Sequence, residues 1–266
     1  MKVVILCGGK GTRLREKSEM IPKPMVSIGG RPILWHIMKI YSSFDFNDFV
    51  LTLGYKSEVI KQYFLNYRTM GSDFVLDLGK NSDVRYLGEE VVENWNITFA
   101  DTGEDAMTGS RVAQIGKYIQ GERFLLTYGD GVANIDLNQL VRFHEEHGRI
   151  GTVSGVHMPS RFGKLVVNTE NNLVEKFTEK PLESGTADYI NGGFFMFNRE
   201  FLNYVDHDES CVLEREPLEQ LAKDGELAIY RHNGYWQCMD TYRDWLTLEK
   251  LWQSGDAPWK PIVHSN

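Results

Sequence analysis

The sequence contains little cysteine, and its cysteines form no recognisable pair. Cys7, Cys211 and Cys238 are the three cysteines of the chain, they include no C-x-x-C motif, and any pairing leaves one over. A small disulfide scaffold would need an even set of cysteines, and a structural zinc site would need clustered cysteines or histidines. The composition therefore excludes both and favours a reducing compartment.

The sequence also lacks a long apolar run and an excess of positive charge. No stretch approaches the ~20 apolar residues of a membrane span, and the first residues enter a strand pattern without the shape of a signal peptide. The net charge of −8 argues against broad binding to nucleic acid or to anionic membranes. We expect a cytoplasmic protein that binds neither.

What is present is an ordinary globular composition with alternating strand and helix patterns. Of the 266 residues, 42% are hydrophobic and 25% are charged, as is typical of a globular protein. Continuous apolar runs at 2–6, 48–54 and 123–128 predict buried parallel strands. A helix-period segment follows each of the first two runs, at 31–44 and at 57–67. This order predicts an α/β fold with a doubly wound, mostly parallel sheet, Rossmann-like, in three αβα layers.

The pattern changes beyond residue 150. Short strand-like runs follow, separated by Asn, Gly and Pro, and residues 168–172 carry a hairpin turn signal. We expect residues 1–150 and 151–266 to be two parts of a single compact domain, the second part mixed and rich in strands, with one sheet continuing through both.

Ligands bind to such sheets at the carboxyl ends of the strands. The loops that follow Leu6, Gly54, Ala100 and Tyr128 should therefore meet at one rim. We expect the ligand site there.

Positive charge gathers at the start of the chain, although the chain as a whole is acidic. Seven cations face two anions within residues 1–31, an excess of five. These cations alternate with glycine and proline and not with helix-period apolar residues, which favours a small anionic ligand over a solvated surface. They are Lys2, Lys10, Arg13, Arg15, Lys17, Lys23 and Arg31.

A glycine-rich turn, LCGGKGTRL at 6–14, follows the first strand directly. Such a turn brings backbone N–H groups close to a phosphate, and nearby cations assist. The dinucleotide pattern G-x-G-x-x-G fails because Leu14 stands where the third glycine belongs, and no G-K-[ST] closes a P-loop. An NAD-linked oxidoreductase and a P-loop ATPase are therefore disfavoured.

The turn GGKGTRL and the following PKPMVSIGGRPIL are together similar to the signature of the sugar nucleotidyltransferases, which make nucleotide sugars from a nucleoside triphosphate and a sugar 1-phosphate. DTGEDAMTGSR, LTYGDGVANID, RFGKLVV, FTEKP, INGGFFMFN and WQCMDTYRD follow in the family's order along nearly the whole chain. YGDG and MTGSR resemble the branch that joins CTP and glucose 1-phosphate into CDP-glucose. Glu16 and Ser18 stand where thymidylyltransferase relatives carry proline and threonine, and Cys7 stands where relatives commonly carry alanine.

The resemblance implies in-line attack of the sugar phosphate on the α-phosphorus of CTP, with pyrophosphate leaving and Mg²⁺ as the cofactor. A phosphate with a second pKa of ~6 is largely dianionic at neutral pH, so the attacking group needs no general base. The reaction does need two polyanions to be aligned and their charge neutralised. The resemblance assigns this catalytic role to Arg13 and Lys23.

The resemblance also implies the remaining site residues. Mg²⁺ prefers oxygen ligands, and Asp130 and Asp240 would supply them. Residues 1–150 would bind the nucleotide, and 151–266 the sugar phosphate. The nucleotide-binding set is Leu6, Cys7, Gly8, Gly9, Lys10, Gly11, Thr12, Arg13, Lys23, Thr108, Gly109, Arg111 and Tyr128. The sugar-phosphate-binding set is Glu179, Lys180, Asn191, Gly192 and Trp236.

The residues themselves leave structural roles open. An aspartate after a strand is commonly a turn residue or a helix cap, Gly192 fits a β-bulge, and Trp236 fits a core position. Thr108 fits a helix cap. Packing roles are as well supported for Arg111 and Tyr128 as contacts to cytosine, whose amine donates and whose N3 and O2 accept.

Two alternatives concern the function. The first is the same reaction with dTTP or UTP. The second is a non-catalytic regulator that binds a nucleotide sugar, and such a protein would not need Lys23, Asp130 or Asp240. The presence of all three favours the enzyme. The resemblance further implies a symmetric homo-oligomer, a hexamer, that acts in the synthesis of a bacterial surface polysaccharide such as the O-antigen of lipopolysaccharide.

Overall fold

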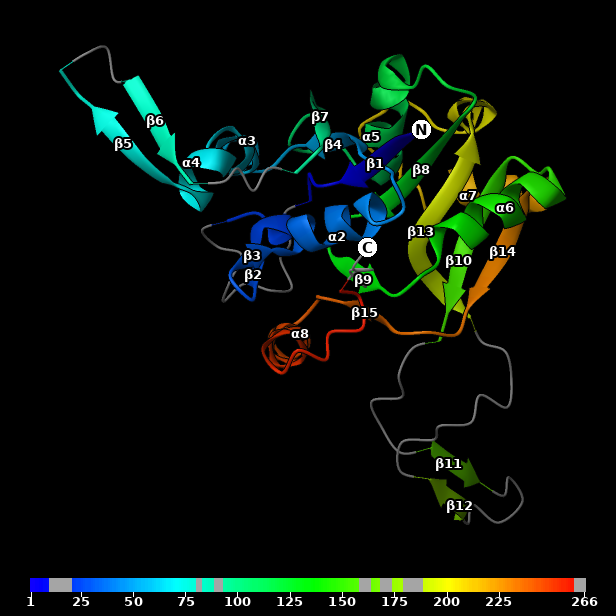
Figure 1. Ribbon diagram of the computed structural model, residues 1–266. Coiled ribbons are helices and arrows are strands. Elements are labelled where there is room, and N and C mark those ends of the chain that lie inside the picture. Colours follow the sequence, from blue (N-terminus) through cyan, green and yellow to red (C-terminus); the bar gives the residue numbers. More distant parts are fainter. Residues whose placement is uncertain are drawn as a thin grey trace.

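The computed structural model describes residues 1–9, 21–79, 83–88, 93–157, 164–167, 174–178 and 189–260; for 164–167 and 174–178 it describes the backbone alone. A seven-stranded sheet runs through the molecule (Figure 1), with its strands in the order β14-β10-β13-β8-β1-β4-β7. These strands are β14 (Leu227–His232), β10 (Gly151–Val156), β13 (Ile190–Asn198), β8 (Arg123–Tyr128), β1 (Lys2–Leu6), β4 (Asp48–Leu53) and β7 (Asn96–Asp101). Strands from before and after residue 150 thus share one sheet.

The sheet is parallel except at one strand. β1 pairs in parallel with β4 and β8, β4 with β7, and β10 with β14, whereas β13 is antiparallel to both of its neighbours. Because parallel strands are covered on both faces, they carry continuous apolar runs, and Val3, Val4 and Ile5 of β1 are all fully buried. The predicted fold class, a doubly wound and mostly parallel α/β sheet, is confirmed.

Two separate cores lie on the two faces of the sheet, because successive side chains of a strand point to opposite sides. Val3 and Ile5 belong to the core of one face, and Val4 and Leu6 to that of the other. The first face is covered by α2 (Ile33–Ser42), α3 (Ser57–Leu65), α6 (Leu137–His147) and α8 (Tyr242–Gln253). The second is covered by α5 (Thr108–Gln114), α7 (Glu216–Lys223) and the 3₁₀ helices η3 (Ile115–Tyr118) and η4 (Arg199–Asn203).

Short ribbons and single turns complete the fold. β11 (Lys164–Val167) and β12 (Val174–Thr178) form the antiparallel hairpin that the turn signal at 168–172 predicts. A second hairpin, which the sequence did not reveal, projects from the body beyond α3 (Figure 1). The remaining elements are η2 (Lys23–Met25), β2 (Ser27–Ile28), β3 (Arg31–Pro32), α4 (Tyr67–Gly71), β5 (Asp73–Asp77), β6 (Asp83–Leu87), β9 (Gly131–Ala133) and β15 (Trp236–Cys238).

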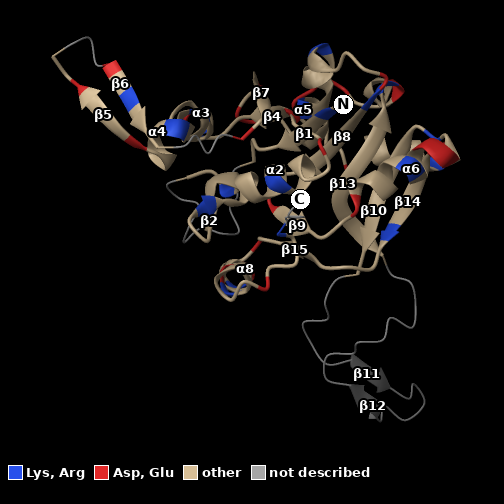
Figure 2. Cartoon of the chain, in the orientation of Figure 1, with Lys and Arg blue, Asp and Glu red and all other residues tan. Residues whose placement is uncertain are grey.

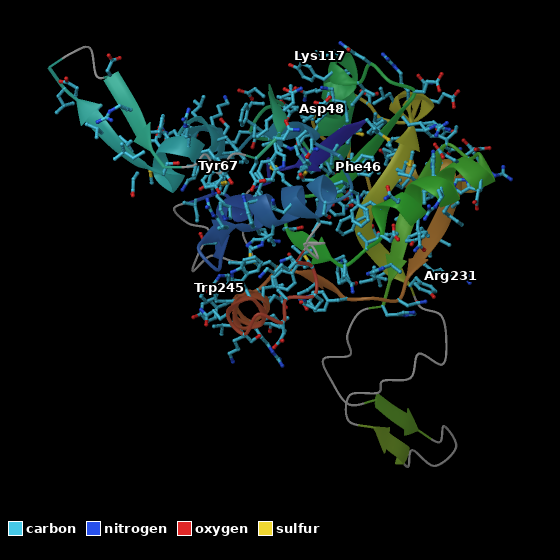
Figure 3. The ribbon with its side chains drawn as sticks, in the orientation of Figure 1. Phe46, Asp48, Tyr67, Lys117, Arg231 and Trp245 are labelled. Carbon is cyan, nitrogen blue, oxygen red and sulfur yellow. The ribbon has the colours of Figure 1, made fainter. Side chains whose placement is uncertain are left out.

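Charged side chains lie around the sheet and not within it. β10 and β13 contain no charged residue, and Figure 2 shows the charges on the surrounding helices, loops and strand ends. α8 is tied to the body by Trp245, whose indole Nε1–H donates to the Ser27 carbonyl at 2.8 Å (Figure 3). Among the described residues, no helix combines the length and the apolar character that a membrane span requires.

The carboxyl ends of four parallel strands meet at one rim. Leu6 at the end of β1 is in register with Thr52 of β4 and Tyr128 of β8, and Thr52 is in register with Ala100 of β7. The predicted convergence of the loops after these strands is confirmed, and it places the glycine turn beside the YGDG segment.

Candidate active site

A cavity of about 350 Å³ opens at this rim, above the ends of β1 and β8. Its walls come from the first turn of the chain, the segment at 23–24, the start of α5 and the segment after β8. The lining residues are Leu6, Cys7, Gly8, Gly9, Lys23, Pro24, Ala106, Met107, Thr108, Arg111, Tyr128, Gly129, Asp130 and Asp240. Most of the residues predicted to bind nucleotide or metal that the structure describes are therefore brought together around one space.

Lys23 is held between two carboxylates at this cavity. Its Nζ atom lies 2.6 Å from Asp130 Oδ2 and 2.6 Å from Asp240 Oδ1, and its side chain is 11% exposed. Burial by itself lowers the pKa of the ammonium group, but the charge of Asp130 and the hydrogen bonds to both carboxylates outweigh burial and raise the pKa above its ordinary value. Lys23 is thus a fixed cation at the pH of the cell.

Local packing explains why Lys23 stands there. Pro22 and Pro24 flank it, and the single turn of η2 ends with the Val26 N–H donating to the Lys23 carbonyl. Gly129 has no side chain at the point where Pro24 approaches, and a Cβ there would lie 3.0 Å from the proline ring and 2.7 Å from the Leu6 carbonyl. The glycine before Asp130 therefore lets the segment around Lys23 pack closely against the end of β8.

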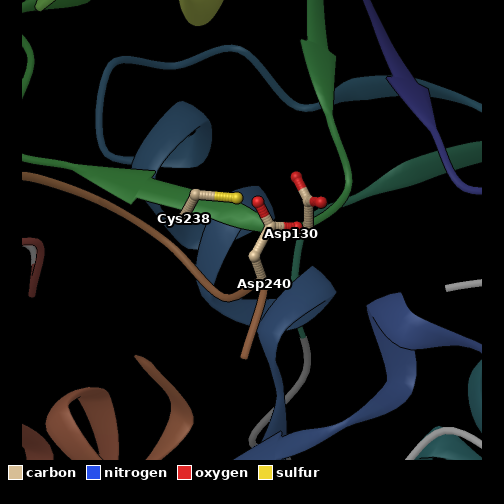
Figure 4. Close-up of side chains that lie close together, drawn as sticks. All are labelled: Asp130, Cys238 and Asp240. Atoms are coloured by element: carbon tan, nitrogen blue, oxygen red, sulfur yellow. The ribbon is translucent and has the colours of Figure 1, made fainter. Parts of the chain in front are cut away.

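Asp130 and Asp240 are joined through a short antiparallel pair of strands, β9 and β15. Cys238 pairs with Gly131, and the Met239 N–H donates to the Asp130 carbonyl at 2.8 Å. The carboxylates and the Cys238 thiol each offer a ligand atom, and these three atoms lie within 4.8 Å of one another (Figure 4). Burial, and then the charge of Asp130, raises the pKa of the Cys238 thiol well above its usual value, so the anionic donors are the two carboxylates. Two converging carboxylates suit a hard divalent cation.

Arg111 lines the cavity, but its guanidinium is engaged with the protein. The side chain is buried, and its Nη2 donates to the Gly8 carbonyl at 3.0 Å. Its Nη1 donates to Thr102 Oγ1 at 2.6 Å and to the Gly103 carbonyl at 2.8 Å. Arg111 therefore binds the glycine turn to the loop after β7.

The two glycines after β1 differ in their surroundings. A Cβ on Gly8 would lie 2.1 Å from Arg111 Nη1, whereas a Cβ on Gly9 would meet no atom within 4 Å. Gly8 is therefore required by the Arg111 guanidinium packed against it. Gly109 is buried, and its N–H donates to the Cys211 carbonyl at 3.0 Å, where α5 packs against the loop before α7.

A second, small cavity of about 30 Å³ lies beside the first and shares Tyr128 and Asp130 with it. Asn191, Gly192 and Trp236, which were predicted to bind the sugar phosphate, line this second space. The Trp236 Nε1–H donates to the Gly192 carbonyl at 2.7 Å, so the indole is fixed against β13. The described part of the predicted sugar site thus lies next to the predicted metal ligands.

Glu214 is a site residue that the sequence analysis missed. It accepts hydrogen bonds from the Tyr128 hydroxyl at 2.5 Å and from the Thr108 hydroxyl at 2.8 Å. Burial, and then the charge of Glu214, raises the pKa of the Tyr128 phenol well above its usual value. Glu214 lies in the loop before α7, outside every motif, so no local pattern could have indicated it.

Some predicted residues fall outside the described part of the chain. For nucleotide binding and catalysis these are Lys10, Gly11, Thr12 and Arg13, and for sugar-phosphate binding they are Glu179 and Lys180. Their roles stay predictions.

Comparison with known proteins places the chain among its relatives. A sequence model described as nucleotidyl transferase matches residues 2–251. The chain is 48% identical, over 98% of its length and 99% of the relative's, to a probable glucose-1-phosphate cytidylyltransferase of Bacillus subtilis. It is 46% identical, over 98% and 99% of the two lengths, to the glucose-1-phosphate cytidylyltransferase of Salmonella typhimurium. Its fold resembles the crystal structure of HddC from Yersinia pseudotuberculosis, with a TM-score of 0.68 at 24% identity over 94% and 99% of the two chains.

The chain belongs to the nucleotidyl transferase family. Within this family its strong similarity is to glucose-1-phosphate cytidylyltransferases, over nearly the full length of both chains. The predicted resemblance is confirmed, and with it the class of enzyme.

Proposed function

We propose that this protein joins CTP and α-D-glucose 1-phosphate to give CDP-glucose and pyrophosphate. The observation that carries the proposal is the convergence of Lys23, Asp130 and Asp240 on one cavity, directly beside the glycine turn. The choice of CTP and glucose 1-phosphate rests on the similarity to the Bacillus and Salmonella relatives.

The residues at the cavity suit transfer between two polyanions. The Lys23 ammonium is charged and fixed, and can stabilise negative charge on the phosphates where the bonds form and break. Gly8 and Gly9 line the same wall, and Gly9, beside which no atom lies within 4 Å of a Cβ position, leaves room for a phosphate near the backbone. The described residues around the cavity offer no histidine, in agreement with a phosphate nucleophile that carries its own negative charge.

Mg²⁺ is the proposed cofactor, and Asp130 and Asp240 would hold it. The bound ion would supply charge neutralisation on the phosphates. The Lys23 ammonium lies between these two carboxylates. We propose that Lys23 and Arg13 both face the phosphates of the bound substrate.

The remaining assignments are proposals on the same footing. Residues 1–150 would bind CTP, with Thr108, Arg111 and Tyr128 near the base and ribose, and residues 151–266 would bind the sugar phosphate. The protein would act in the cytoplasm as a homo-oligomer, a hexamer by resemblance, in the synthesis of a surface polysaccharide. Light scattering coupled to size-exclusion chromatography tests the oligomer.

The activity is tested by incubating the protein with glucose 1-phosphate, Mg²⁺ and CTP, dTTP or UTP in separate reactions, and measuring pyrophosphate. We expect the highest kcat/KM with CTP. Faster turnover with dTTP or UTP would overturn the nucleotide assignment, and no pyrophosphate with any of the three would favour a binding protein without catalysis.

A further inference from the structure

Tyr128 is one of two residues, with Asp130, that line both cavities. It lines the larger with the glycine turn and the smaller with Asn191 and Trp236. The ring is held on one side by Phe195, edge to face at 5.8 Å between ring centroids. On another side lies Gly193, where a Cβ would come within 2.6 Å of the ring. Backbone and core packing therefore fix the ring, and its hydroxyl is left to be fixed by polar partners.

The hydrogen bonds at this hydroxyl have only one possible direction. The Gly193 N–H donates to Asn191 Oδ1 at 2.8 Å, so the amide turns its Nδ2 to the Tyr128 hydroxyl, at 3.1 Å. The hydroxyl oxygen accepts there and must donate its own hydrogen elsewhere. A carboxylate only accepts, and Glu214 Oε1 takes this hydrogen.

The other oxygen of Glu214 orients a hydroxyl group of the larger cavity, that of Thr108, in the same way. Glu214 Oε2 accepts from the Thr108 hydroxyl at 2.8 Å, and Thr108 Oγ1 accepts from the Leu213 N–H at 2.9 Å. One carboxylate thus sets the direction of two hydroxyl groups, one at the start of α5 and one at the end of β8. Through Tyr128 this order reaches Asn191 on the sugar side.

We infer that Glu214 is a positioning residue that fixes the Tyr128 hydroxyl and, through it, the Asn191 amide in the orientation that binds glucose 1-phosphate. The inference rests on the proposed function, because it takes the smaller cavity, lined by Asn191 and Trp236, as part of the glucose 1-phosphate site. Glu214 acts through Tyr128, since the Tyr128 hydroxyl is the group that links it to Asn191.

The test compares steady-state kinetics of the wild type, Glu214→Ala, Glu214→Gln, Tyr128→Phe and the double variant Glu214→Ala/Tyr128→Phe. Hydrogen bonds to a charged group are the strong ones, and we expect Glu214→Ala to raise the KM for glucose 1-phosphate about tenfold. The KM for CTP should rise only about twofold, because Thr108 keeps its bond to Leu213. Glu214→Gln keeps one acceptor oxygen and should recover part of the loss. The KM for glucose 1-phosphate should be no higher in the double variant than in Tyr128→Phe alone, because Glu214 reaches Asn191 only through the Tyr128 hydroxyl.

Glu219→Ala, which removes the same charge from an exposed position on α7, is the matched control and should retain wild-type KM values. Melting temperatures show whether each variant folds, and if Glu214→Ala does not, Tyr128→Phe must still raise the KM for glucose 1-phosphate. Wild type that makes no CDP-glucose would refute the proposed function and the inference with it. Active wild type with an unchanged KM in Glu214→Ala, or additive losses in the double variant, would refute the inference alone.

Discussion

Lys23 and Asp240 are 217 residues apart in the chain, and their side chains meet at 2.6 Å. Asp240 follows β15, which pairs with β9, and β9 follows Asp130 directly. The segment that carries Asp240 is thereby brought to the segment that carries Lys23. The consequence is that the Lys23 ammonium lies between two carboxylates at the cavity.

Replacing Asp130 with asparagine should abolish most of the activity while leaving the fold intact. The variant keeps the shape of the side chain but loses the charge that a divalent cation and Lys23 both use. We expect kcat/KM to fall at least about 100-fold and Mn²⁺ binding, followed by electron paramagnetic resonance, to weaken. Asp256→Asn, at an exposed position away from the cavity, is the control. Unaffected turnover in Asp130→Asn would show that the proposed metal role is wrong.

Replacing Lys23 with methionine should separate metal binding from catalysis. Without the ammonium, Asp130 and Asp240 repel each other and attract a divalent cation more strongly, so Mn²⁺ should bind tighter to the free enzyme. Turnover should nevertheless fall about 10- to 100-fold, because the cation that faces the phosphates is gone. Lys223→Met, on the exposed side of α7, should change neither quantity. Weaker Mn²⁺ binding in Lys23→Met would contradict the competition between lysine and metal.

Alanine at Gly8 should destabilise the protein, whereas alanine at Gly9 should leave its stability unchanged. The new methyl at Gly8 would lie 2.1 Å from Arg111 Nη1, and this guanidinium is buried and held by several carbonyls. Overpacking of this kind costs about 1–3 kcal/mol, so the melting temperature should drop and the KM for CTP should rise. The methyl at Gly9 meets no atom within 4 Å, and its melting temperature should equal that of the wild type. Equal melting temperatures for both variants would argue against the Arg111 contact.

His36 should make the protein less stable in mild acid. Its ring is buried between the Ile28 carbonyl, 2.8 Å from Nε2, and the Trp259 indole N–H, 3.4 Å from Nδ1. Burial, opposed by the hydrogen bond to Ile28, lowers the pKa of His36 to about 4 from its ordinary 6.5. Below pH 6.5 the unfolded chain therefore takes up a proton that the folded protein does not bind until about pH 4. The free energy of unfolding decreases as the pH is lowered through this window.

The contribution of His36 is full above pH 6.5, and its loss by pH 4 amounts to about 3 kcal/mol at most. The measurement is the urea midpoint as a function of pH for the wild type and for His36→Gln, whose amide can still donate to Ile28 and cannot become charged. We expect the variant to be less sensitive to pH between 4 and 6.5. Parallel curves for the two proteins would assign the acid sensitivity to other groups.

Much of the fold follows from local pattern. The apolar runs at 2–6, 48–54 and 123–128 became β1, β4 and β8, because a strand covered on both faces needs apolar residues without interruption. The hairpin of β5 and β6 escaped notice for the opposite reason. Neither of its faces is buried against the body, and Phe74, Leu76 and Leu87 are exposed. Three apolar residues stand in a row in β5, Phe74, Val75 and Leu76, so β5 shows no alternation of apolar and polar residues.

The candidate site was predictable where a motif carries it, and not elsewhere. The glycine turn, Lys23 and Asp130 belong to short motifs with a physical reason, and the structure lines one cavity with them. Glu214 belongs to no motif, and only the packing of the loop before α7 against α5 brings it to Tyr128 and Thr108.

The sequence alone determined the layers of the fold and the rim where the candidate site lies, because these depend on local periodicity and on residues close in the chain. The tertiary structure decided which side chains meet. It placed Lys23 between Asp130 and Asp240 and directed the Arg111 guanidinium to the carbonyl of Gly8. It also placed Tyr128 where it lines both cavities. Contacts between residues more than one hundred positions apart depend on how strands pair and helices pack, and no local pattern encodes those distances.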